Sequence, residues 1–141
     1  MMDLNRAIGM LTLRLVLGFI FLMQGLGKVF TWGLDNVYAS SFAAYEKWLP
    51  GWLLSATAYY TSYVELIAGL LLIIGFWRNY ALYALSSVLV IVAFGHGLSS
   101  PIWPLEHVIF RLMLVVSLLL LPKDWDRFQV ELYLSFRKGV P

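Results

Sequence analysis

The sequence predicts an all-α integral membrane protein built as a bundle of four helices, and three observations support this prediction. Hydrophobic residues make up 61% of the 141 residues and charged residues only 13%, whereas soluble domains are roughly 45 to 50% apolar. The mean hydropathy is +0.79. Four apolar stretches have lengths close to that of a helix that crosses a bilayer, which is about 20 residues. We therefore expect one domain, 1–141, with spans at about 8–29, 53–76, 80–97 and 105–121 and a short tail at 122–141.

The composition also excludes several classes of function. The chain contains no cysteine, so disulfide exchange, cysteine-ligated iron–sulfur clusters and covalent c-type haem are excluded. The formal net charge is only +2, with the basic residues scattered along the chain, so we expect no nucleic-acid partner. The expected partners are the lipid bilayer and other membrane or peripheral subunits, or further copies of this chain as a homo-oligomer.

The first span places its polar and small residues on one helical face. Arg14, Gly18, Gly25 and Lys28 recur at helical spacing, and Gln24 lies beside them. Small residues let helices approach closely in lipid, and polar residues turn away from it, so this face should point into the bundle. We expect the two glycines to serve helix packing. The start of the chain lacks the pattern of a cleaved signal peptide, so we expect this span to be retained.

The loop at 30–52 is long and rich in aromatic residues. Within it, Tyr38, Phe42, Tyr45 and Leu49 recur at helical spacing. This pattern predicts a short helix in the first outer loop that lies in the membrane interface, where aromatic side chains gather. An aromatic lid over a bound ligand is the alternative interpretation.

The second span carries a carboxylate, Glu65, near its midpoint. A charged group there usually faces the bundle interior and has a partner. With a rise of about 1.5 Å per residue, Arg14 and Arg111 lie on either side of it in depth, so we predict a buried polar core of these three residues. Such a core either fixes helix register as an ion-pair network or provides a proton path or headgroup anchor. Its positive excess could be balanced by Glu106 or by an anionic ligand.

A second polar group is predicted at the outer ends of the spans. It comprises His96 at the end of the third span, Glu106 and His107 at the start of the fourth, and Gln24 and Lys28. The breaker SSPIWP separates the last two spans. The group is a candidate quinone or proton site, because histidine can hydrogen-bond a quinone carbonyl and relay protons near neutral pH. The two histidines could instead ligate a b-type haem, or a metal together with Glu106.

The basic residues outside the spans predict that both termini lie on the cytoplasmic side. Under the positive-inside rule, this choice places six of them inside: Arg6, Arg78, Lys123, Arg127, Arg137 and Lys138. The tail alternates apolar and polar residues from Phe128 to Arg137, which predicts a strand. Such a strand would pair with another chain. A helix on the membrane surface is the alternative.

Two motifs resemble those of a known family of small membrane proteins, DoxX. RLVLGFIFLMQGLGKVF is similar to that family's arginine, glycine and G-x-x-K signature, with Arg14, Gly18, Gly25 and Lys28 in the matching places. VELIAGLLLIIGFWRNYAL is similar to its E-x-x-x-G-x-x-x-x-x-G pattern and basic turn, matching Glu65, Gly69, Gly75 and Arg78. We expect the latter two glycines at helix contacts as well. The fourth span departs from the family, with LLPKDWDRF where members often have a glycine-proline-glycine segment and a Ser-x-Asp.

The resemblance implies a four-helix, multi-pass protein of the prokaryotic cytoplasmic (inner) membrane. The family includes the small subunits of thiosulfate:quinone oxidoreductase and other redox-associated membrane proteins, and membership leaves open whether this chain is an enzyme. Our leading hypothesis is a membrane-embedded subunit of, or accessory to, a redox complex, which would present a quinone to partner proteins. The alternatives are a non-catalytic structural or assembly subunit, whose loop and tail bind another protein, and a small transporter lined by the charged stripe.

Overall fold

The computed structural model describes residues 2–100 and 106–137. Four helices form most of the chain: α1 (Met2–Leu26), α3 (Gly51–Ile74), α4 (Arg78–Ser99) and α5 (Glu106–Leu120). Shorter helical pieces join and follow them: η1 (Gly27–Trp32), α2 (Leu34–Val37), η2 (Tyr38–Phe42), η3 (Ala43–Lys47), η4 (Lys123–Trp125) and α6 (Val130–Arg137). No strand occurs in the described part of the chain, which confirms the all-α prediction.

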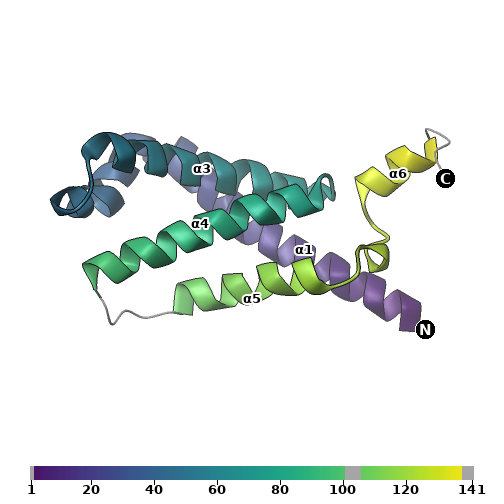
Figure 1. The fold of residues 1–141 in the computed structure, drawn as a ribbon. Coiled ribbons are helices and arrows are strands. Elements are labelled where there is room, and N and C mark those ends of the chain that lie inside the picture. Colours follow the sequence, from purple (N-terminus) through teal and green to yellow (C-terminus); the bar gives the residue numbers. More distant parts are fainter. Residues whose placement is uncertain (1, 101–105, 138–141) are drawn as a thin grey trace.

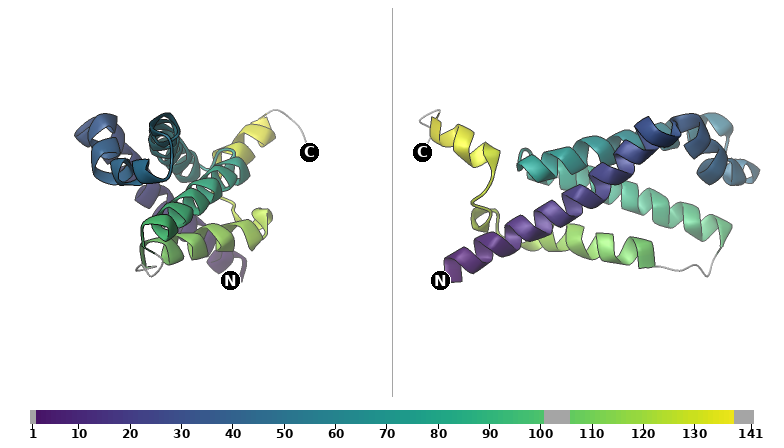
Figure 2. Two further views of the ribbon diagram at one scale, coloured as in Figure 1. Left: turned by 60° about the vertical axis from the view of Figure 1, so that its left-hand side comes forward. Right: turned by 180° about the vertical axis from the view of Figure 1, so that it is seen from behind.

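The long helices lie side by side, and α1 crosses behind the others at an angle (Figure 1). It makes most of its contacts with α3 and fewer with α5. The start of α1 and helix α6 lie at one end of the bundle, the terminal end, and residues 27–50 lie at the opposite end, the loop end (Figure 2). Consecutive long helices therefore alternate in direction.

Within the described residues, three helical stretches are long and apolar enough to cross a membrane: Asp3–Trp32, Gly51–Ile74 and Arg78–Ser99. The chain is thus a helical protein with the features of a membrane protein. Helix α5 has 15 residues and, at about 1.5 Å per residue, spans about 22 Å of a hydrocarbon core of about 30 Å. The fourth crossing therefore stays a prediction, as does the cytoplasmic placement of the termini.

Glycines lie where α1 and α3 approach each other most closely. A Cβ atom at Gly69 would overlap the backbone of Leu22, and a Cβ atom at Gly25 would overlap the backbone of Leu66. Gly18 lies at the same interface. Lipid supplies no hydrophobic drive between helices, so close contacts through small residues are a main source of helix association. These glycines therefore set the distance between α1 and α3.

An apolar core joins all four long helices. Its fully buried members include Met10, Leu17, Phe21, Leu72, Leu82, Leu85, Val115 and Leu118. They come from α1, α3, α4 and α5, and α5 packs against α1 and α4 even though it is short. In such close-packed interiors, a change of even one methylene is felt.

The loop end is an almost continuous run of short helices, in agreement with the helical spacing of its aromatic residues. Tyr38 donates a hydrogen bond to Oε1 of Glu46 at 2.6 Å, and this bond raises the pKa of Tyr38. Tyr45 donates to Oγ of Ser99 at 3.4 Å, which ties the loop to the end of α4. Its place in the membrane interface stays a prediction.

The tail after α5 is helical, so the predicted strand is wrong. Residues Val130–Arg137 form α6 and Lys123–Trp125 form η4. A helix satisfies its own backbone hydrogen bonds, which a lone strand cannot, and alternation over so short a run does not separate the two. The tail also folds back on α1, where the guanidinium of Arg6 lies 4.7 Å from the ring centroid of Trp125.

Candidate functional site

An ion pair joins η1, which continues α1, to the middle of α3. Nζ of Lys28 donates a hydrogen bond to Oε2 of Glu65 at 2.6 Å. The Glu65 side chain is 4% exposed and the Lys28 side chain 28%, so a buried carboxylate is neutralised by a cation that reaches the surface. Arg111 of α5 is close enough to act electrostatically on Glu65 as well. Two cations therefore face one carboxylate in this half of the bundle.

A cavity of about 500 Å³ opens beside this ion pair. Its polar lining includes Lys28, Ser40, Ser41, Thr61 and His96, and its apolar lining comes from the loop and from α4. Such a volume lies within the range of about 300 to 1,000 Å³ that is usual for small-molecule sites. Lysine supplies donors only, and hydroxyls supply donors and acceptors. The cavity therefore suits a compact polar group that accepts hydrogen bonds.

The structure brings together part of the predicted outer cluster. Lys28 and His96 line this one cavity, whereas Gln24 lines a separate hollow of about 330 Å³ that also touches Lys28. Glu106 is exposed at the start of α5. The side chain of His107 lies outside the described part of the structure, as do residues 101–105 of the predicted breaker region. Among the side chains that the structure describes, which do not include that of His107, no three from His, Asp or Glu gather as a metal site would require.

Arg14 does not pair with Glu65, because its carboxylate partner is Asp126 of the tail. Nη1 of Arg14 lies 3.3 Å from Oδ2 of Asp126, and its Nη2 donates to the carbonyl oxygen of Phe128 at 2.6 Å. Arg78 approaches the same Oδ2 at 3.7 Å and donates to the carbonyl oxygen of Leu118 at 2.8 Å. We call Arg14, Arg78 and Asp126 the tail clamp. It holds the tail against the middle of α1, the start of α4 and the end of α5.

The tail clamp is almost fully buried. The side chains of Arg14, Arg78 and Asp126 are 1%, 2% and 0% exposed. Burial raises the pKa of the Asp126 carboxyl, and the two guanidiniums oppose that shift. Gly75 at the end of α3 has a φ of +69°, a conformation that favours glycine, and a Cβ atom there would overlap the guanidinium of Arg14. The turn after α3 therefore leaves room for the Arg14 guanidinium because its glycine has no Cβ atom.

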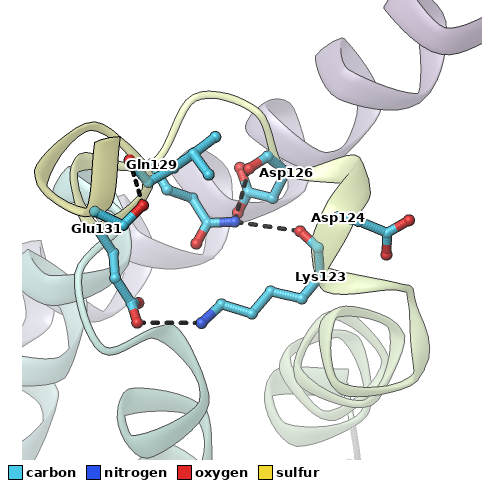
Figure 3. A pocket seen from close by; sticks show the side chains of 7 residues that line it. Lys123, Asp124, Asp126, Gln129 and Glu131 are labelled. Carbon is cyan, nitrogen blue, oxygen red and sulfur yellow. Dashed lines mark hydrogen bonds and ion pairs between the residues drawn. The ribbon is translucent and has the colours of Figure 1, made fainter. Parts of the chain in front are cut away.

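The tail next to the clamp holds itself in place by internal contacts. Gln129 donates from Nε2 to the carbonyl oxygen of Asp126 at 2.7 Å and to that of Lys123 at 3.3 Å (Figure 3). Lys123 and Glu131 pair at 3.2 Å across a cavity of about 410 Å³, which tail residues line (Figure 3). These contacts stabilise a fold of the tail, so we assign the clamp a structural role.

The clamp contains two residues that the sequence patterns do not place inside the protein. Arg78 reads as a basic residue of a turn and Asp126 as part of a surface tail. The available signal was the charge imbalance, since two buried arginines and one glutamate require a further anion. Asp126 supplies that anion for Arg14, while Lys28 occupies the place beside Glu65.

A comparison with known families matches residues 9–97 to DoxX. The match covers more than half of the chain and includes Lys28, Glu65 and Arg78, but it stops before α5 and Asp126. No curated protein and no solved structure matches the chain.

Proposed function

The chain belongs to the DoxX family, and from that premise we propose that it is a membrane-embedded subunit of, or accessory to, a redox complex that binds a quinone at its loop end. The observation that supports this proposal is the cavity of about 500 Å³ beside the Lys28–Glu65 ion pair. It combines fixed polar groups with apolar walls at the ends of helices long enough to span a membrane. A membrane quinone needs such a combination, because its ring is polar at two oxygens and apolar elsewhere.

Each polar residue that lines the cavity has its own role in this proposal. When bound, the quinone would supply the electron- and proton-carrying chemistry. Lys28, held by Glu65, offers ammonium donors to a carbonyl oxygen. The hydroxyl of Thr61 already donates to the carbonyl oxygen of Ala58 at 3.3 Å, so it can offer only a hydrogen-bond acceptor. His96 lines the cavity near the end of α4, and an imidazole carries nitrogens that can donate or accept a hydrogen bond. The loop helices supply part of the cavity wall.

A structural or assembly subunit is the second candidate, and the shape of the tail favours it. Helix α6 extends away from the bundle (Figure 1), and Tyr133 on it is 70% exposed. Removing residues 130–141 would take away α6 and keep Asp126 in the tail clamp. A scaffold should then lose its protein partner while the chain stays inserted, whereas a quinone subunit should keep its quinone.

The test of the proposed function is purification of the chain from its host membrane in mild detergent, followed by extraction and quantification of quinone. We expect the wild-type protein to carry quinone in proportion to protein. A double variant, Lys28→Gln with Glu65→Gln, removes both charges of the ion pair together, so neither member is left without its partner. It should insert at the wild-type level and lose the quinone.

The matched control is Lys47→Met, which removes an exposed lysine of the loop that does not line the cavity. It should retain quinone at the wild-type level. Absence of quinone from the wild-type protein, or its full retention in the double variant, would overturn the proposal.

A further inference from the structure

A second cavity, the apolar groove, lies between α3, α4 and the loop helices. Its volume is about 400 Å³, and its lining includes Leu49, Leu53, Leu54, Val90 and Phe94. Thr57 also lines the groove, but its hydroxyl already donates to the carbonyl oxygen of Leu53 at 2.8 Å. The groove therefore offers almost only hydrocarbon contacts.

The apolar groove adjoins the polar cavity at Lys28. Four residues line both of them: Phe42, Tyr45, Ile91 and Gly95. One belongs to η2, one to η3 and two to α4, so the boundary between the cavities is formed by the loop helices against α4. A ligand that crosses this boundary would have a polar part on one side and an apolar part on the other.

The groove also faces the surroundings of the bundle. Its walls on α4, Val90 and Phe94, are 67% and 61% exposed, and they lie within a helix long and apolar enough to span a membrane. A wall of this kind would contact lipid chains. Access to the groove is therefore from the side, through the hydrocarbon layer, and water-soluble ligands are poor candidates for it.

From these three features we infer that the apolar groove and the polar cavity form one binding site for an amphiphile with a compact head and a single hydrocarbon chain. The head accepts hydrogen bonds near Lys28, and the chain lies between α3 and α4. The inference rests on the proposed function only for the identity of the head as a quinone. A compact carboxylate head would satisfy the same lysine, and the two heads are distinguished below.

Two photoreactive probes test this assignment in the full-length protein in lipid nanodiscs. Each carries a diazirine midway along one long chain; one has a quinone head and the other a carboxylate head. Mass spectrometry then locates the labelled residues. We expect adducts concentrated on Leu53, Leu54, Val90 and Phe94. Adducts spread equally over other exposed apolar residues, such as Phe19 and Ile67, would overturn the inference.

A pair of glycine variants tests whether the two cavities are connected. A Cβ atom at Gly95 would lie 3.9 Å from the ring of Tyr45, an ordinary contact, so Gly95→Leu places a branched side chain at the boundary without a clash at its first atom. Gly97→Leu is the matched control, because nothing lies within 4 Å of a Cβ atom there and Gly97 lines neither cavity. Labelling of the groove should fall about tenfold in Gly95→Leu, since a steric change of this size typically shifts binding by that order. It should be unchanged in Gly97→Leu, and equal labelling of the two variants would contradict a connected site.

The outcomes separate this inference from the proposed function. Labelling of the groove by the carboxylate probe alone would support a single-chain amphiphile site and count against quinone. In the opposite case, quinone is extracted with the wild-type protein and lost from the double variant, but the groove is not labelled preferentially. That result would support the proposed function and refute the binding of a hydrocarbon chain in the groove.

Discussion

The tail clamp gives the sharpest quantitative prediction, because its carboxylate is wholly buried between two cations. Asp126→Asn keeps the shape of the side chain and removes its charge. With an effective dielectric constant of about 20, the pairs at 3.3 Å and 3.7 Å have gross attractions of about 5 and about 4.5 kcal/mol. Repulsion between the guanidiniums and the desolvation of all three groups offset much of this. Breaking a buried pair costs about 3 to 5 kcal/mol, and Arg14 and Arg78 keep their bonds to carbonyl oxygens, so we expect a loss of about 3 kcal/mol.

The assay is reversible unfolding of the purified chain in mixed micelles of mild detergent and dodecyl sulfate, followed by circular dichroism. Asp124→Asn is the matched control, since Asp124 lies two residues away and is exposed; surface changes of this kind stay within about 0.5 kcal/mol. A double-mutant cycle with Arg14→Met should show that the two losses are not additive. If Asp126→Asn destabilises no more than Asp124→Asn, the clamp does not stabilise the fold.

Three further predictions follow from other contacts. Gly69→Leu places a side chain against the backbone of Leu22 and should destabilise the fold by about 3 kcal/mol in the same unfolding assay. Gly9→Leu is the control and should be neutral, because nothing lies within 4 Å of a Cβ atom there. Equal effects of the two substitutions would refute the glycine contact. A chain truncated after Gln129 keeps Asp126 and should unfold like the full-length protein, but one truncated after Leu121 should lose stability as Asp126→Asn does. Glu65→Gln leaves Lys28 unpaired, but because that lysine is 28% exposed the loss of unfolding free energy should be only about 1 kcal/mol; a loss as large as that of Asp126→Asn would show that the lysine is effectively buried.

The positions of the helices could be predicted closely from the chain. The predicted second and third spans, 53–76 and 80–97, compare with the observed helices Gly51–Ile74 and Arg78–Ser99. A long apolar segment in lipid must satisfy its backbone hydrogen bonds internally, which leaves the helix as the main solution. This rule does not apply to the tail, because the tail is short and lies outside the predicted spans. Its alternation of apolar and polar residues favoured a strand, whereas the structure has a helix.

The partners of the buried charges could be predicted only in part. Helical rise gives the depth of Glu65, Arg14 and Lys28 along their helices, but not which side chains point at one another around the bundle. The long, flexible side chain of Lys28 reaches back to Glu65, although its position suggested an outer, more exposed place. Arg14 is buried, as its helical face indicated, yet its partner comes from the tail, 112 positions away in the sequence.

The sequence by itself determined the class of the protein, its four long helices and the small-residue face of α1, because apolar composition and helical periodicity are local properties that each segment carries alone. Only the tertiary structure decided that Asp126 pairs with Arg14 and Arg78 and that Lys28 pairs with Glu65. It also decided that a polar cavity and an apolar groove adjoin where the loop helices meet α4. Each of these depends on contacts between segments far apart in the chain, and the free energy of such contacts is set by geometry that no single segment encodes.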